Sequence, residues 1–151
     1  MPTIAAMRVD EYLAAPDGER ESKLAGLTAA ELLALGVELF NAGRFFEAHE
    51  AWEAVWLEAP RELRAFYQGL IQVAAAFVHL TRDEYPGTVK LLAEGIGKLE
   101  AYPASFMGLD LAALVAAAAA VRQRAVALGA RRLEEIDAGL LPRIEASTTE
   151  R

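Results

Sequence analysis

The chain reads Phe45-Phe46-Glu47-Ala48-His49-Glu50-Ala51-Trp52-Glu53-Ala54-Val55-Trp56 at its most distinctive point, and this stretch decides the fold. Within about three helical turns it holds both tryptophans, two phenylalanines, one of the two histidines and three carboxylates. On a helical wheel, His49 and Glu53 fall inside an aromatic arc with Glu50 at its edge, whereas Glu47 and Glu58 fall on the opposite side. Ionisable groups on a buried face are costly unless they are paired or bind a ligand. The pattern therefore predicts a site on this helix.

Almost every other segment also carries a helix pattern, and none shows the alternation of a strand. Thr28 and Glu31 have the spacing of a capping box, and Gly43 is placed to end that first helix. The same analysis expects helices over about residues 44–58, 60–82, 86–99 and 110–128, with a short one near residues 131–138. We therefore expect an all-α fold, a compact single-domain bundle of about five helices around a central antiparallel helix hairpin.

The domain boundaries are expected near the two ends. Residues 1–27 look like a polar N-terminal lead with one short helix at most, because Pro16-Asp17-Gly18 interrupts them. Residues 28–141 are then the all-helical domain, and residues 142–151 are expected to be a frayed tail. Glycines 95 and 97 would weaken their helix unless another backbone packs closely there.

Composition narrows the classes of function. The net charge of −7 argues against nucleic-acid binding, which needs a basic face. The absence of cysteine excludes disulfides, thiolate zinc sites and thiol nucleophiles. The start has no basic segment followed by an apolar run, so a cytoplasmic protein is expected. The longest apolar stretch, Leu111–Val121, falls short of the roughly 20 residues of a membrane span. Its alanine run, Ala116–Ala120, favours close helix packing and self-association.

The hairpin geometry predicts which polar side chains meet. The link at Ala59-Pro60 is short, so residues equidistant from it should face each other. This sets His49 beside Gln68 and Gln72, and Glu53 level with residues 64–68. His79 lies roughly 15 Å further along its helix than the residues that are level with His49. The expected polar pocket comprises His49, Glu50, Glu53, Arg64, Gln68 and Gln72, with Asn41 and His79 as secondary residues.

Three interpretations of this pocket remain open. The first is a bracing network in which Glu53 or Glu50 pairs with Arg64 and His49 bonds a glutamine. The second is a divalent metal bound by His49 and Glu53 at i, i+4, although the second histidine of a zinc-protease motif is missing. The third is general acid–base catalysis by His49.

The first interpretation makes the protein an interaction or scaffold module with a structural polar cluster and no cofactor. The alternative is a small enzyme or metal-binding protein that uses His49, Glu50 and Glu53. The sequence does not decide whether the protein is an enzyme.

Several of these residues resemble a known family. The stretch Phe40-Asn41-Ala42-Gly43-Arg44-Phe45-Phe46-Glu47-Ala48-His49-Glu50, then Trp52-Glu53, Gly69-Leu70-Ile71-Gln72 and His79, is similar to a small all-helical prokaryotic family catalogued as domain of unknown function 309. The resemblance covers about Leu35 to Tyr102. It implies a short helical protein, with His49, Glu50, Gln72 and His79 at motif positions, and it carries over no established activity.

Overall fold

The computed structural model describes residues 9–147, and helices dominate it. The first eight residues of the expected lead, and residues 148–151 of the expected tail, lie outside this range. In chain order the elements are α1 (Val9–Ala14), α2 (Asp17–Ala25), α3 (Ala29–Asn41), α4 (Phe45–Trp56), α5 (Arg61–Thr81), α6 (Tyr85–Leu99), strands β1 (Ser105–Phe106) and β2 (Leu109–Asp110), α7 (Leu111–Leu128), and the 3-10 turns η1 (Ala130–Glu135) and η2 (Ala138–Leu140).

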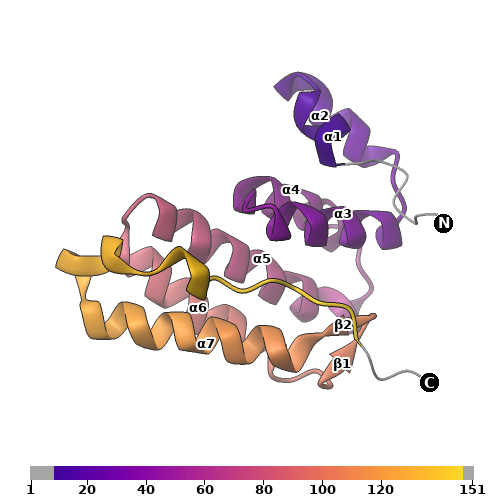
Figure 1. Ribbon diagram of the computed structural model, residues 1–151. Coiled ribbons are helices and arrows are strands. Elements are labelled where there is room, and N and C mark those ends of the chain that lie inside the picture. Colours follow the sequence, from indigo (N-terminus) through magenta and orange to yellow (C-terminus); the bar gives the residue numbers. More distant parts are fainter. Residues whose placement is uncertain (1–8, 148–151) are drawn as a thin grey trace.

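These elements stack in layers (Figure 1). Helices α1 and α2 lie together over the α3–α4 pair, and α5, α6 and α7 form the opposite side. Helix α5 is central, because it packs against α4 on one side and α6 on the other. The structure confirms the all-α fold and the antiparallel α4–α5 hairpin at its centre.

The first two core helices form for the local reasons expected from the sequence. Thr28 caps α3 in a capping box: its hydroxyl accepts from the Glu31 amide, and the Glu31 carboxylate accepts from the Thr28 amide. Gly43 turns the chain toward α4 with a φ of +79°, a conformation that glycine adopts without steric cost. Such stop and start residues fix where α3 ends and where α4 begins.

Two close helix contacts rest on glycine. A Cβ on Gly36 of α3 would overlap the indole of Trp52 on α4, so the ring packs directly on the α3 backbone. A Cβ on Gly95 of α6 would lie 2.9 Å from the carbonyl oxygen of Gly69 on α5. This confirms that another backbone packs closely at Gly95, whereas nothing lies within 4 Å of a Cβ on Gly97.

The N-terminal region differs from the expected polar lead. Within its described part it forms two helices, α1 and α2, and Tyr12, Ala15 and Leu24 are buried in the core. The Pro16 break separates the helices without ending the fold, since Pro16 is the N-cap of α2. These apolar side chains pack onto the core, and so the region is part of the globular structure.

The C-terminal region also differs from expectation. The short helix expected near residues 131–138 is replaced by the two 3-10 turns, and residues 142–147 pack on the body of the protein. Ile144 is buried, its amide donates to Asn41 Oδ1 at 2.8 Å, and its carbonyl accepts from Asn41 Nδ2 at 3.0 Å. Residues 142–147 of the segment expected to be a frayed tail are therefore packed against the rest of the protein.

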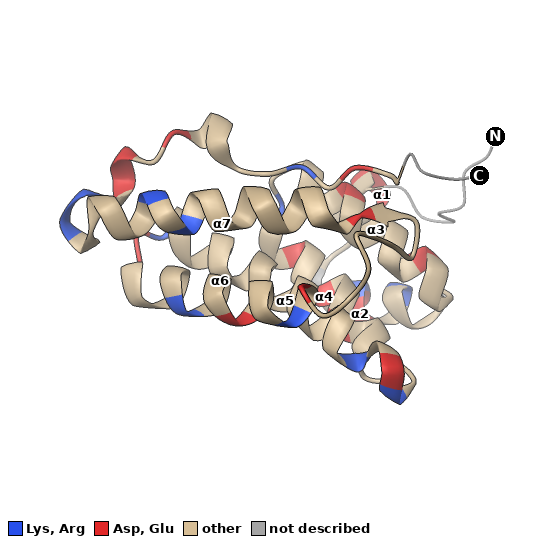
Figure 2. Ribbon diagram, turned by 90° about the horizontal axis from the view of Figure 1, so that it is seen from below, with Lys and Arg blue, Asp and Glu red and all other residues tan. Residues whose placement is uncertain are grey.

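Helix α7 is long and apolar. It extends seven residues past the expected apolar stretch, and its 18 residues have a mean hydropathy of 1.5. By length and composition it could cross a membrane, a test that the core helix of a soluble protein also passes. Its ribbon is uncharged over most of its length in Figure 2, with basic residues near its C-terminal end. One face, including Leu114, Ala118 and Val121, is buried in the bundle.

Candidate functional site

One face of α4 enters the hydrophobic core, as the wheel predicted for most of its aromatic residues. Trp52 has no exposed surface and donates its indole N–H to the Leu33 carbonyl at 3.3 Å. The Phe45 ring contacts Phe40 and Phe77 at centroid distances of 5.1 and 5.3 Å. Phe46 is also on the aromatic arc of the wheel, but it is 48% exposed and lines the side of α4 that faces α2. Of the aromatic side chains of α4, Phe46 is therefore the one exposed at the surface.

The six residues of the expected pocket do not form one closed network among the described residues. His49 Nε2 lies 3.9 Å from Glu53 Oε2, at a distance typical of a weak, partly exposed pair. Arg64 was expected to pair with Glu53 or Glu50, but its guanidinium lies over the Trp56 ring and donates to the Trp56 carbonyl at 3.4 Å. Stacking on the indole is favourable for a guanidinium, and it removes Arg64 from the carboxylates.

The two glutamines also depart from the expected pairing with His49. Gln72 of α5 donates to Glu94 of α6 at 3.3 Å, while Gln68, also on α5, is half-buried. His49 Nδ1 and Gln72 Oε1 are buried atoms without a hydrogen-bond partner in the described part of the chain. The hairpin model located these residues on facing helices, but Gln72 bonds Glu94 in place of His49.

The secondary residues have structural contacts. His79 Nδ1 lies 2.6 Å from a Glu84 carboxylate oxygen, and its ring packs on Gly87 at the start of α6. Asn41 is occupied by its two hydrogen bonds to Ile144. Among residues 9–147 there is no group of three or more His, Cys, Asp or Glu side chains that could hold a metal ion. The metal interpretation keeps only the His49–Glu53 pair, because Glu50 bonds a different partner.

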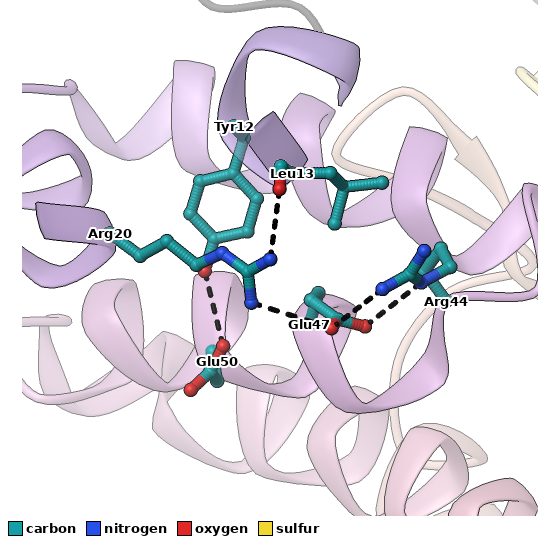
Figure 3. A network of polar contacts seen from close by, with 6 residues as sticks. All are labelled: Tyr12, Leu13, Arg20, Arg44, Glu47 and Glu50. Atoms are coloured by element: carbon teal, nitrogen blue, oxygen red, sulfur yellow. Dashed lines mark hydrogen bonds and ion pairs between the residues drawn. The ribbon is translucent and has the colours of Figure 1, made fainter. Parts of the chain in front are cut away.

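That partner belongs to a polar network on the opposite face of α4 (Figure 3). The wheel placed Glu47 opposite the aromatic arc, and it is nevertheless only 9% exposed. Its carboxylate accepts from Arg44 at 3.0 and 3.3 Å, and Arg20 of α2 lies 3.6 Å away. Arg20 also donates to the Leu13 carbonyl at 3.0 Å. Glu47 therefore joins α4 to both N-terminal helices.

Tyr12 closes the network from α1. Its hydroxyl donates to Glu50 at 3.2 Å, and the Arg20 guanidinium lies 5.4 Å from the centre of its ring (Figure 3). The pattern that could have revealed this arrangement is the set of apolar residues in the lead, Tyr12, Leu13 and Leu24. Apolar residues at these positions indicate that α1 and α2 pack against another part of the protein. In the structure they pack on the face of α4 that carries Glu47.

The contacts of the network shift the pKa values of Glu47 and Tyr12, and the hydrogen bond to Glu47 also raises the pKa of Arg44. Burial acts to raise the pKa of Glu47, but hydrogen bonds from Arg44 and the charges of Arg44 and Arg20 outweigh it and hold the pKa below its ordinary value. Burial and the neighbouring Glu50 carboxylate raise the pKa of Tyr12 well above its ordinary value. Glu47 is therefore ionised and Tyr12 neutral at physiological pH.

Beside this network, a cleft of about 820 Å³ opens between α2 and α4. Five carboxylates and one guanidinium line it, those of Glu21, Glu47, Glu50, Glu53, Glu58 and Arg20. Two exposed apolar side chains, Phe46 of α4 and Leu57 at the C-cap of that helix, also line it. The cleft can hold a cationic, partly apolar ligand.

A family model described as "Domain of unknown function (DUF309)" matches residues 33–91. This segment is similar to the DUF309 family. The match confirms the resemblance drawn from the sequence. The matched segment contains α4 and α5 in full together with parts of α3 and α6. Arg44, Glu47 and Glu50 lie inside the DUF309 segment, whereas Tyr12 and Arg20 lie before it.

The chain is also similar to YpuF of Bacillus subtilis (strain 168), a protein described as uncharacterized. The two are 38% identical over 64 residues, which cover 41% of this chain and 37% of the relative. The chain thus matches little more than a third of the relative's length. The likeness concerns a segment and assigns no activity.

Proposed function

We propose that this protein is an interaction module that binds a basic, amphipathic helix of a partner protein in the cleft between α2 and α4. The observation that carries the proposal is the negative charge of the cleft, which is lined by five carboxylates and one guanidinium. The same cleft also exposes apolar side chains. A helix with lysine or arginine on one flank and aliphatic residues on the other complements both features.

The apolar part of the cleft has the length of a helical binding surface. Phe46 is 48% exposed and Leu57 is 65% exposed, so both would lose water-exposed surface on binding. They are eleven residues apart on α4, a distance of about 16 Å along the axis. Glu50 and Glu53 follow Phe46 at i+4 and i+7 and line the same cleft, which puts negative charge along the same side of the helix. A ligand helix lying along α4 would contact all four.

The carboxylates do not contribute equally. Glu47 is balanced by Arg44 and Arg20, and Glu50 is engaged by Tyr12. Glu21, Glu53 and Glu58 are exposed residues of the lining, so they are the ones available to attract a cationic side chain. The net charge of −7 favours association with basic partners in general, and the cleft is the binding site that we propose for them.

The test uses a synthetic 18-residue helical peptide of leucine and lysine, labelled with fluorescein, and measures its Kd by anisotropy. Phe46→Ser with Leu57→Ser is expected to weaken binding at least tenfold, and Glu53→Gln with Glu58→Gln at least threefold. The matched controls are Leu140→Ser, another exposed leucine, and Glu38→Gln with Glu134→Gln, two exposed glutamates outside the cleft. Equal binding by cleft variants and controls would overturn the proposal.

The alternative from the sequence, an enzyme or metal-binding protein, has weaker support in the geometry. It needs His49, Glu50 and Glu53 to act together, but Glu50 accepts from Tyr12 and the remaining pair is separated by 3.9 Å. Its direct test is elemental analysis of protein purified without chelator. One equivalent of a divalent metal, lost in His49→Ala, would favour the alternative.

We also infer that the exposed side of α7 binds a second copy of this chain. Ala112, Ala119 and Val126 are seven residues apart and so share one side of the helix. Val126 is 48% exposed, and an apolar hollow of about 310 Å³ lies beside Ala112 and Val115. An antiparallel pair centred near Ala119 would bring each Val126 to the hollow of the other copy. Burial of α7 in this way also suits the cytoplasmic setting that we propose.

Sedimentation velocity tests this pairing. Ala119→Glu is expected to give a monomer at concentrations where the unmodified chain is a dimer, and Ala93→Glu, on the exposed side of α6, is the matched control. Because the chain lacks cysteine, a bismaleimide should join Ala112→Cys to Val126→Cys in a mixture but not Val126→Cys to itself. A monomer at all concentrations, or flotation of the chain with lipid vesicles in place of a dimer, would overturn the inference.

A further inference from the structure

The cleft between α2 and α4 continues into a second, smaller hollow. This hollow has a volume of about 180 Å³ and lies where the start of α3 meets the α4–α5 connection. Its walls are mainly aliphatic, with Leu27 and Leu32 on the α3 side, Val55 on α4 and Leu63 on α5. The chain around it is therefore suited to an apolar group.

The hollow and the cleft share part of their lining. Ala54, on the last turn of α4, and Glu58, just after that helix, border both. A chain segment that lies along the cleft can therefore reach the hollow without leaving the protein surface. Glu58 is the one charged residue in the lining of the hollow, and it stands between the aliphatic walls and the acidic cleft.

We infer that the partner helix is anchored by one aliphatic side chain, of the size of leucine, isoleucine or methionine, inserted between α3, α4 and α5. This inference rests on the proposed function and specifies its ligand. The volume falls below the range of about 300–1,000 Å³ typical of sites for whole small molecules, so it suits a single side chain. Aliphatic walls bury such a side chain favourably.

The position of Glu58 adds a second feature of the partner. A lysine or arginine one helical turn from the anchor, at i+3 or i+4, lies on the same side of the partner helix. With the anchor in the hollow, that basic side chain is close to Glu58 and to the acidic cleft beyond it. The ligand class is therefore a basic helix with an aliphatic anchor followed or preceded by a basic residue one turn away.

The test compares two 18-residue peptides of lysine and alanine, one with a single central leucine and one with alanine at that position. Isothermal titration with the unmodified chain is expected to show about tenfold tighter binding of the leucine peptide, in line with burial of one aliphatic side chain. Both peptides should weaken similarly as salt is raised, because their charges are the same. Equal affinity of the two peptides would overturn the inference.

Protein variants then locate the effect. Ala29 lines the hollow and is exposed, so Ala29→Leu should fill the hollow and remove the preference for leucine. Ala30→Leu, at the neighbouring exposed position of α3 that lines neither cavity, should retain the full preference. A preference that survives Ala29→Leu would overturn the inference.

The outcomes separate this inference from the proposed function. Binding that is salt-dependent and weakened by Glu53→Gln with Glu58→Gln, but indifferent to the leucine, contradicts only the anchor. Absence of binding by either peptide and by the leucine–lysine peptide contradicts the proposed function itself. The peptide comparison on the unmodified chain needs no variant, so it does not depend on how a substitution affects folding.

Discussion

On one side of α4, Trp52 is buried against the backbone of Gly36; on the other, Glu47 is buried against Arg20 and Arg44. The first contact depends on shape, because an indole lies where any side chain on Gly36 would overlap it. The second depends on charge, because a carboxylate loses water there and regains favourable contacts from two guanidinium groups. One helix is thus held by two kinds of interaction that respond to different perturbations.

The apolar contact should show the largest response. Gly36→Ala is expected to destabilise the protein by about 3 kcal/mol, since the added methyl group overlaps the Trp52 ring and forces the helices apart. Gly97→Ala, at an exposed helical glycine with open space around it, should instead stabilise by up to about 1 kcal/mol. Urea unfolding followed by circular dichroism measures both. Equal effects would show that helix propensity, and not the Trp52 contact, sets the response at Gly36.

The charged contact should come next. Glu47→Gln keeps the shape of the side chain but removes the charge that faces Arg44 and Arg20, so a loss of about 2 kcal/mol is expected. Glu53→Gln, at an exposed carboxylate of the same helix, should cost less than about 0.5 kcal/mol. A negligible loss for Glu47→Gln would mean that the burial of this carboxylate cancels the benefit of its partners.

The same contact has a defined pH dependence. The pKa of Glu47 is lower in the folded protein than its ordinary value of 4.5, so the unfolded chain binds more protons between the two values. The stabilisation from Glu47 is therefore complete above about pH 4.5 and is lost as the pH falls through the lower, native pKa. Unfolding curves of the unmodified protein and Glu47→Gln should converge in acid. A constant difference across this range would contradict the lowered pKa.

Tyr12→Phe should have a smaller effect, about 1 kcal/mol, because the ring stays buried and only the hydrogen bond to Glu50 is lost. Tyr85→Phe, at a tyrosine outside the network, is the control. Since the native pKa of Tyr12 is raised above its ordinary value of 10.0, the unmodified protein should lose stability as the pH rises past 10. Tyr12→Phe should lack that part of the loss, as alkaline unfolding would show.

His49→Ala should have the smallest effect, below about 1 kcal/mol. Its pair with Glu53 is long and partly exposed, and its buried Nδ1 has no partner among the described residues to lose. Urea unfolding measures the change. A loss above about 2 kcal/mol would restore the bracing network expected from the sequence and would make this side of α4 as important as the Glu47 side.

Local patterns were sufficient to predict the main helices. The capping box at Thr28 and the glycine turn at Gly43 depend on residues within a few positions, and both are found where expected. The short Ala59-Pro60 link likewise placed α5 beside α4. Such features are encoded by neighbours in sequence, so a chain read without a structure reveals them.

The candidate site was harder to predict because it depends on contacts distant in sequence. Glu47 meets Arg20 and Glu50 meets Tyr12 through α1 and α2, which lie in the segment expected to be a polar lead. The wheel assigns Glu47 an angle but cannot say which segment covers that side. Arg64 illustrates a second limit: its level on α5 was derived from the hairpin, whereas its choice of Trp56 over a carboxylate is a matter of side-chain conformation.

The paired hydrogen bonds between Asn41 and Ile144 have a consequence for the order of folding. They join residues that are 103 positions apart, so forming them requires closure of a very long loop. The α4–α5 and α5–α6 contacts link neighbours in sequence and cost far less chain entropy. We expect the helical pairs to assemble first and the Asn41–Ile144 contact to form after the rate-limiting step, so that it slows unfolding without hastening folding.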